Sequence, residues 1–202
     1  MRVFEIKPNF AYQTFYTSDP NGSETEREEY SLDGGSKLKR WKPLPIFEGD
    51  PGLKPVGNFA HCWDGGFIID VRASSVLKPI LEKCAELLPL QRYKGNLYHL
   101  LNVLEPLDCL DDRRTKWRIG KKHGKRIGID EYQFIPSKLT NTTLFRLPKR
   151  VALFTAVGRP GSKVEFKTIV EREGLTGLKF EEIWSEDGPP IKVKGIIEEV
   201  LG

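Results

Sequence analysis

Alternating hydrophobic and polar positions recur along the chain and predict β-strands. Phe4 and Ile6 alternate with charged residues near the N-terminus, and residues 67–72 form a short apolar run typical of a buried strand. Further strands are predicted at residues 12–16, 95–104 and 178–184. These segments indicate a protein in which a β-sheet forms much of the fold.

Two of the alternating segments are expected to pair as a β-hairpin. They are residues 115–119 and 126–134, and the segment 120–124 between them is polar and bounded by glycines. Polar, glycine-containing connections of this kind join antiparallel strands. The connecting residues should therefore lie at an exposed tip.

The clearest helical pattern begins at Ser74 or Ser75, either of which can accept a hydrogen bond from an amide of the first turn. Pro79 falls in that first turn, where a missing amide costs least, and Pro89 is placed to end the helix. We therefore predict a helix over residues 75–88. The apolar positions that recur at helical spacing are Leu77, Ile80, Leu81, Cys84, Leu87 and Leu88.

A second helix is predicted over residues 163–173. It starts with a capping box, Ser162 to Glu165, in which each side chain can bind the other residue's backbone amide. Gly174 is placed to end it in a left-handed conformation. Its buried face is expected to consist of Phe166, Ile169 and Val170.

These elements predict an α+β fold, in which two main helices pack against an antiparallel or mixed sheet. The length of 202 residues suits one large domain or two small lobes. We divide the chain into a β and loop extension at 1–39, an α+β domain at 40–187 and a tail at 188–202. The expected core residues are Ile80, Leu81, Leu87, Leu101, Phe134, Phe145, Phe166, Ile169 and Phe180.

The cysteines and the lack of long apolar stretches bear on the compartment. Cys62, Cys84 and Cys109 are an odd number at wide spacing, which fits neither a secreted disulfide framework nor a paired zinc site. Residues 1–7 carry a charge at about every second position, unlike a secretory signal. No segment approaches the roughly 20 apolar residues that cross a bilayer. We therefore expect a cytoplasmic protein with no membrane partner.

Charge is distributed unevenly along the chain. The net charge of +4 is a mild excess, but residues 113–126 contain eight Lys or Arg and no acidic residue. Trp117 lies inside this run and could stack on a nucleic-acid base. The run is interpreted in three ways: a solvated hairpin tip, a nucleic-acid contact, or a surface for an acidic protein partner. The candidate partner-binding residues are Arg113, Arg114, Lys116, Trp117, Arg118, Lys121, Lys122, Lys125 and Arg126.

Recognisable catalytic, cofactor and metal motifs are absent from the sequence. Neither phosphate-binding glycine pattern occurs, and His61, His99 and His123 lie dozens of residues apart. The acidic cluster of Asp108, Asp111 and Asp112 could hold magnesium or form an acid–base pair, although such residues more often form turns. We therefore predict no catalytic residue, no cofactor and no metal ligand.

Several sequence blocks follow one another in order between residues 40 and 185. The blocks are Ala85-Glu-Leu-Leu-Pro-Leu90, Leu101-Asn-Val-Leu-Glu-Pro-Leu-Asp-Cys-Leu-Asp111, Glu131-Tyr-Gln-Phe134, Leu144-Phe-Arg-Leu-Pro148 and Gly174-Leu-Thr-Gly-Leu-Lys-Phe180. Together they resemble a bacterial family. It was first catalogued as a domain of unknown function and later grouped as the eleventh family of immunity proteins of polymorphic toxin systems. Two departures from this resemblance are Ala85, where relatives often have glycine, and the insert-like segment 157–161.

The resemblance implies that the chain is not an enzyme. It implies an immunity protein that binds a cognate toxin domain, encoded by a neighbouring gene, and neutralises it by stoichiometric inhibition. Two alternatives remain: an enzymatic antidote that removes a toxin's modification, and a nucleic-acid-binding module, although nucleic acid is not the expected partner. The sequence does not predict the toxin's identity, the binding face or the oligomeric state.

Overall fold

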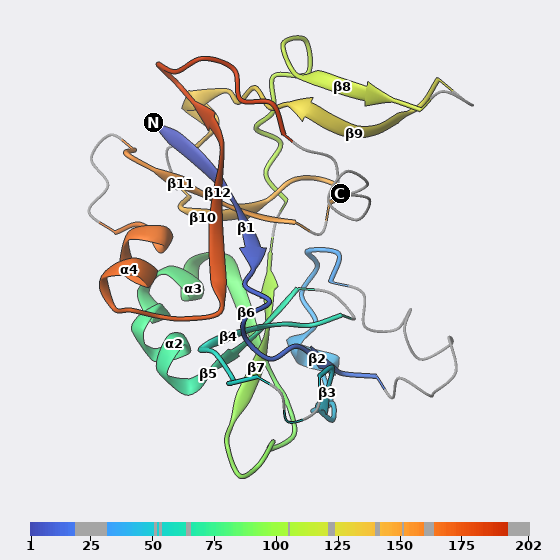
Figure 1. Cartoon of the computed structure of the whole chain (residues 1–202), viewed down its shortest axis with the longest axis vertical. Helices are drawn as coiled ribbons and strands as arrows, with labels where there is room; N and C mark the ends of the chain where they lie inside the picture. Colours follow the sequence, from blue (N-terminus) through green and yellow to red (C-terminus); the bar gives the residue numbers. More distant parts are fainter. Residues whose placement is uncertain are drawn as a thin grey trace.

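The fold is a mixed α+β arrangement in which strands dominate (Figure 1). The computed structural model describes residues 1–18, 32–50, 52, 54–63, 66–104, 106–120, 124–139, 142–150, 152–159 and 164–193. Within these ranges the strands form two four-stranded and two two-stranded sheets, and all their pairings are antiparallel. The predicted fold class is confirmed. The expectation of two main helices fits loosely, because the α-helices have only six or seven residues each.

The first four-stranded sheet is built around the N-terminal strand. Its order is β10 (Leu144–Arg146), β11 (Leu153–Val157), β1 (Arg2–Pro8) and β12 (Leu178–Ser185). The predicted strands at Phe4 and Ile6 and at residues 178–184 are thus confirmed. Residues 2–8, which the sequence analysis assigned to an extension, lie between two strands from the C-terminal half of the chain (Figure 1).

The second four-stranded sheet has apolar residues on both faces. Its order is β4 (Phe59–His61), β5 (Phe67–Asp70), β7 (Tyr98–Val103) and β6 (Ala85–Pro89). Because successive strand residues point to opposite faces, Leu101 joins one core cluster while Leu100 joins another. The strand predicted over 67–72 is confirmed at 67–70 and wrong at its last two residues, which begin a helix, and the strand predicted over 95–104 is confirmed at 98–103.

The predicted helix over 75–88 is wrong at its start. Two short helices, α2 (Val71–Val76) and α3 (Lys78–Cys84), occupy residues 71–84. The cap of α2 is Asp70, whose Oδ1 accepts from the amide of Ala73 at 2.7 Å, and not Ser74 or Ser75. Pro79 does lie in the first turn of α3, as expected.

The same prediction is wrong at its end. The chain leaves the helical conformation at Ala85, and Leu87 and Leu88 belong to strand β6. There they pair with Leu101 and Leu100 of β7. Pro89 therefore ends a strand, and the hydrogen bonds to β7 replace those of the missing helical turn.

The third helix, α4 (Phe166–Arg172), is close to the predicted second helix. Its Phe166, Ile169 and Val170 are buried, and Gly174 has the expected left-handed conformation with φ of 60°. Ser162 of the predicted capping box lies outside the described residues. The Glu165 carboxylate instead accepts from the amides of Gly158 and Arg159, at 2.7 and 3.3 Å.

Shorter elements complete the fold. β2 (Phe15–Tyr16) pairs with β3 (Phe47–Glu48), so only the last two residues of the predicted strand over 12–16 are in a sheet. Two 3₁₀ helices, η1 (Leu38–Arg40) and η2 (Pro136–Leu139), precede β3 and β10. In the part of the chain that the structure describes, no helix combines the length and the apolar character needed to span a membrane.

Most of the expected core residues are buried. The largest cluster lies between the two four-stranded sheets and the helices, and it contains Ile6, Phe59, Ile80, Leu101 and Phe166. Correctly predicted buried residues are Ile80, Leu81, Leu101, Phe134, Phe145, Phe166 and Ile169. The prediction is too strong for Leu87 and Phe180, which are only half-buried because they pack at the margin of this cluster.

Candidate partner-binding hairpin

The basic segment forms a hairpin that projects from the body of the protein (Figure 1). β8 (Lys116–Ile119) and β9 (Arg126–Glu131) pair antiparallel, with Trp117 opposite Ile129 and Arg118 opposite Gly128. The predicted hairpin is confirmed. Lys121 and Lys122 of the candidate site lie outside the described residues, as does His123.

A turn and a core cluster anchor the base of this hairpin. Asp111 Oδ1 accepts from the backbone amides of Arg113 and Arg114 at 3.1 and 3.2 Å, which starts the turn into β8. The turn-forming interpretation of Asp111 is thus confirmed. Ile129 is buried and Trp117 half-buried in a cluster shared with the first four-stranded sheet. The hairpin base is therefore part of the folded body.

Three cations of the candidate site form ion pairs within the chain. Lys116 Nζ lies 2.7 Å from Glu131, Arg118 lies 2.7 Å from Asp130, and Arg126 binds both oxygens of Asp112 at 2.7 and 3.1 Å. These acids flank the basic run in sequence and are brought beside it by strand pairing. The hairpin is consequently much less positive than its run of cations suggests.

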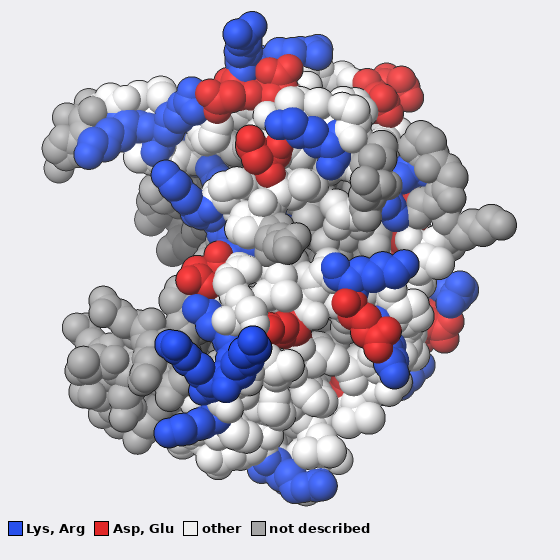
Figure 2. All heavy atoms as spheres, turned by 180° about the vertical axis from the view of Figure 1, so that it is seen from behind, with Lys and Arg blue, Asp and Glu red and all other residues white. Residues whose placement is uncertain are grey.

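The remaining described cations of the site are Arg113, Arg114 and Lys125, and their side chains are exposed. Within the described ranges, none of them has a carboxylate at ion-pair distance. Figure 2 shows Lys and Arg side chains along the projecting arm, with acidic side chains beside them where the arm meets the body. These three cations are the part of the predicted site that can reach a partner.

Trp117 is not available as a stacking platform for a nucleic-acid base. The guanidinium of Arg126 lies over its ring, with the central carbon 4.2 Å from the ring centroid. The rest of the indole packs against the core cluster, and its Nε1 is buried with no hydrogen-bond partner among the described residues. A base could stack here only by displacing Arg126 from both Trp117 and Asp112.

Two exposed isoleucines near the outer end of the hairpin were missed by the sequence analysis. Ile119 is 52% exposed and Ile127 is 63% exposed. Both lie near the same end of the strand pair: Ile119 is opposite Arg126, the residue before Ile127, and Ile127 lies against Gly120, the residue after Ile119. Their positions beside the glycine-bounded tip could have predicted this exposure from the sequence, because residues near the end of a projecting hairpin cannot pack in the core.

The acidic cluster examined for catalysis is already engaged in the fold. Asp111 forms the turn, Asp112 binds Arg126, and the exposed Asp108 lies 3.7 Å from Lys138 Nζ. In the described ranges there is no group of three or more His, Cys, Asp or Glu that could hold a metal ion. His61 and His99 are on strands of one sheet that are not neighbours.

Cys84 and Cys109 have the character of structural thiols. Burial raises the pKa of the Cys84 thiol to about 11, and burial raises that of Cys109 to about 12. The reactive thiolate is therefore scarce at neutral pH. Cys84 also donates to the carbonyl oxygen of Ile80 in its own helix, at 3.4 Å.

Comparison with known proteins adds no further identification. No protein-family model matches the chain, and no curated protein matches it. The resemblance to an immunity-protein family therefore stays a prediction.

Proposed function

We propose that the chain is an immunity protein that binds a bacterial toxin domain stoichiometrically, without catalysis, and that the β8–β9 hairpin provides the contact. The observation that carries this proposal is the exposure of Ile119 and Ile127 on a projecting arm that also bears the exposed cation Lys125. The resemblance to an immunity-protein family supplies the toxin as the partner.

The energetics of these side chains favour a protein partner. Full burial of an isoleucine contributes about 1.5 to 3 kcal/mol, and a side chain already half-buried retains about half of that for binding. Ile119 and Ile127 could together contribute about 2 kcal/mol or more in a complex. An apolar centre with a charged margin is the usual composition of protein interfaces.

The exposed cations of the hairpin indicate what the partner surface should look like. Contact with a basic surface would desolvate Arg113, Arg114 and Lys125 at a cost in binding free energy, whereas an acidic surface would attract them. Attraction of this kind mainly accelerates encounter and depends on ionic strength. The toxin surface that meets the hairpin is therefore acidic or neutral.

The two alternative functions have less support. The nucleic-acid module would need free cations and an open aromatic face, whereas Arg118 and Arg126 are paired with acids and Arg126 covers Trp117. The enzymatic antidote would need the acidic cluster, whose Asp111 and Asp112 are held in structural interactions.

Co-expression with the toxin domain of the neighbouring gene tests the proposal directly. Growth should be rescued, and the purified complex should have a dissociation constant in the nanomolar range or below, about 12 kcal/mol of binding free energy. Toxin activity should reach zero at one equivalent of this protein. No complex and no rescue would reject the proposal, and protection at a small fraction of an equivalent would favour an enzymatic antidote.

Matched variants locate the interface. Ile127→Asp should weaken toxin binding by at least about tenfold, because an unpaired carboxylate would be desolvated in the complex. Leu97→Asp is the control, because Leu97 is 43% exposed and lies directly before β7, away from the hairpin. Equal effects of the two changes would place the interface elsewhere.

A further inference from the structure

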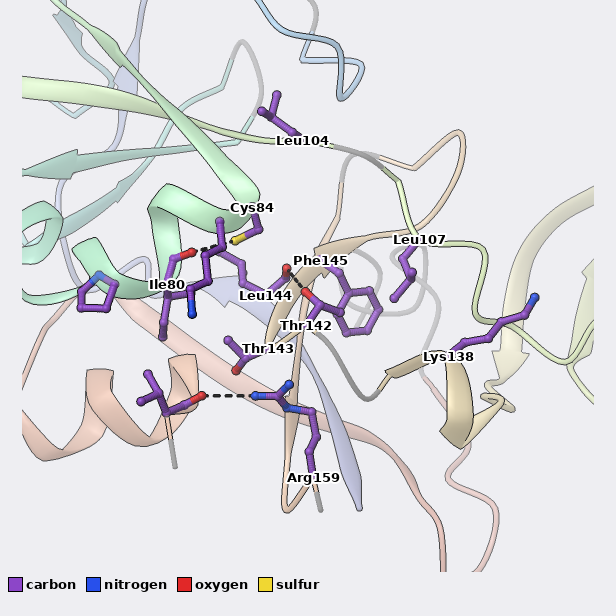
Figure 3. Close-up of a pocket in the computed structure, with 13 residues that line it drawn as sticks. Ile80, Cys84, Leu104, Leu107, Lys138, Thr142, Thr143, Leu144, Phe145 and Arg159 are labelled. Carbon is purple, nitrogen blue, oxygen red and sulfur yellow. Dashed lines mark hydrogen bonds between the residues drawn. The ribbon is translucent and has the colours of Figure 1, made fainter. Parts of the chain in front are cut away.

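The two edge strands of the first four-stranded sheet, β10 and β12, differ in how their backbone groups are satisfied. At β10, the carbonyl oxygen of Leu144 accepts from Thr142 Oγ1 at 2.8 Å (Figure 3). The carbonyl oxygen of Arg146 accepts from the amide of Leu107, also at 2.8 Å. Helix α3 packs beside the same strand. The edge at β10 is therefore already bonded to other parts of the chain.

Both edges of the second four-stranded sheet are likewise bonded to other segments. In β4, the amide of Phe59 donates to the carbonyl oxygen of Thr176 at 2.9 Å. In β6, the carbonyl oxygen of Pro89 accepts from the indole of Trp41 at 2.7 Å. An open sheet edge is a place where another strand can add, and folded proteins usually cover such edges. Strand β12 is the exception here.

The outward backbone groups of β12 follow from its pairing with β1. The amide of Asn9 donates to the carbonyl oxygen of Gly177 at 3.0 Å, so the backbone groups of Gly177 point toward the β1 side. Because this direction alternates along an antiparallel strand, the N–H and C=O of Leu178 and Phe180 point away from β1. Among the described residues, no hydrogen bond reaches these outward groups.

The charges on the exposed face of β12 are poorly matched by β1. Glu181 lies opposite Glu5, and Lys179 lies opposite Lys7, so both pairs bring like charges together. Lys7 offsets part of this repulsion, because its Nζ lies 3.0 Å from Glu5 and 4.0 Å from Glu181. Lys179 is exposed and has no carboxylate at ion-pair distance in the described part of the chain. A strand with the reverse order of charges would fit this edge.

A second copy of β12, running antiparallel, supplies that reverse order. When Phe180 is placed opposite Phe180 of the copy, Lys179 of each chain lies opposite Glu181 of the other. The outward N–H and C=O of Phe180 can then bond to those of the copy. The Phe180 side chain points toward α4, where its ring centroid lies 6.3 Å from that of Phe166. A groove between α4 and β12 leaves room beside it for the second phenyl ring.

We propose that the chain forms a two-fold symmetric dimer in which β12 pairs antiparallel with β12 of a second copy, centred on Phe180. One strand from each chain makes a small interface, so the dissociation constant should be about 10 to 100 μM. The dimer does not depend on toxin binding. Phe180 lies near the start of β12, whereas Trp184, near its end, shares a core cluster with the hairpin base.

Sedimentation equilibrium of the full chain between about 5 and 200 μM tests the proposal, and the mean mass should rise from monomer toward dimer. Amide hydrogen exchange in the same samples locates the contact. Exchange at Leu178 and Phe180 should be about two- to fivefold slower at the highest concentration than at the lowest, because only the dimer bonds these amides. Exchange at Lys179 and Glu181, whose amides face β1, should change less. A protein that stays monomeric, or a dimer in which Leu178 and Phe180 gain no protection, overturns the proposal.

Charge reversals test the register of the pairing. Lys179→Glu and Glu181→Lys should each weaken self-association by at least about fivefold, because like charges then lie opposite one another across the axis. Both side chains are exposed, so both variants should fold. An equimolar mixture of the two variants should associate at least as strongly as the unchanged protein, since an acidic β12 then faces a basic one.

Lys39→Glu is the matched control, because it reverses another exposed lysine away from β12 and should leave self-association unchanged. Equal weakening by Lys179→Glu and Lys39→Glu would assign the effect to net charge and overturn the proposed pairing. A mixture of the two β12 variants that associates no more strongly than either variant alone would overturn it as well.

Discussion

Arg126 lies over the ring of Trp117 and binds both carboxylate oxygens of Asp112, so that one guanidinium joins the basic hairpin to the turn before it. The turn is itself closed by Asp111, whose carboxylate accepts two backbone amides. The most basic segment of the sequence is therefore tied to the acids that flank it.

The first prediction concerns this contact. Arg126→Ala should uncover Trp117 and shift tryptophan emission to longer wavelength, because the indole gains water on one face. The protein has four tryptophans, so the same change in a Trp117→Phe background is the control, and there the shift should vanish. A double-mutant cycle of Arg126→Ala and Asp112→Ala should give about 0.5 kcal/mol of coupling that falls at high salt, since both side chains are largely exposed. A salt-independent coupling would contradict this.

A second prediction concerns encounter with the toxin. Reversing Lys121, Lys122 and Lys125 to Glu should slow association strongly and weaken its salt dependence, because steering acts over about 10 Å at ordinary ionic strength. Thermal stability should be nearly unchanged. The control reverses Lys39, Arg40 and Lys42, which are exposed cations away from the hairpin. Equal slowing in both triple variants would show that net charge matters and the hairpin does not.

The third prediction concerns two glycines, Gly174 and Gly177, that precede β12. Gly177 has φ of 99°, and a Cβ there would overlap the carbonyl oxygen of Phe59. Gly177→Ala should therefore lower the free energy of unfolding by about 3 kcal/mol or more, from backbone strain and from the displacement of β4. Gly174 has φ of 60° with open space around it, so Gly174→Ala should cost only about 1 kcal/mol. Denaturant titrations that give equal losses would contradict the close contact.

The fourth prediction concerns pH. Burial lowers the pKa of His61 and of His99 below the ordinary value of 6.5, because the imidazolium is poorly solvated in the folded protein. The unfolded chain then takes up protons first as pH falls, so the stabilisation present above pH 6.5 is lost progressively below it. The free energy of unfolding should decrease from about pH 7 to about pH 5.5.

Substitution separates this histidine effect from that of other groups. His61→Phe should flatten part of the pH dependence while keeping the aromatic contacts with Trp63 and Phe67. His99→Phe should remove a further part. An unchanged slope in both variants would assign the pH dependence to other residues.

Residues 84–89 show where pattern-based prediction fails. The spacing of Leu77, Ile80, Leu81 and Cys84 is helical and the helix exists, but Leu87 and Leu88 continue that spacing while lying on β6. A pair of adjacent leucines suits either a helix face or a strand buried on both sides. The hydrogen bonds offered by β7 favour the strand, and β7 is supplied by residues 98–103, beyond the reach of a local pattern.

Local sequence was sufficient for elements whose partner strands or capping groups lie close in the chain. The β8–β9 hairpin, the left-handed Gly174 and the buried face of α4 all follow from short-range spacing, because neighbouring residues satisfy their hydrogen bonds. The run of cations in residues 113–126 was likewise evident from the sequence.

Long-range contacts account for the features that short-range spacing could not reveal. The place of β1 between β11 and β12 depends on strands more than a hundred residues away. The pairing of Arg126 with Asp112 likewise depends on which segments pack together. The physical reason is that residue type and spacing specify the character of each segment, whereas pairing energies and shared burial select which segments become neighbours.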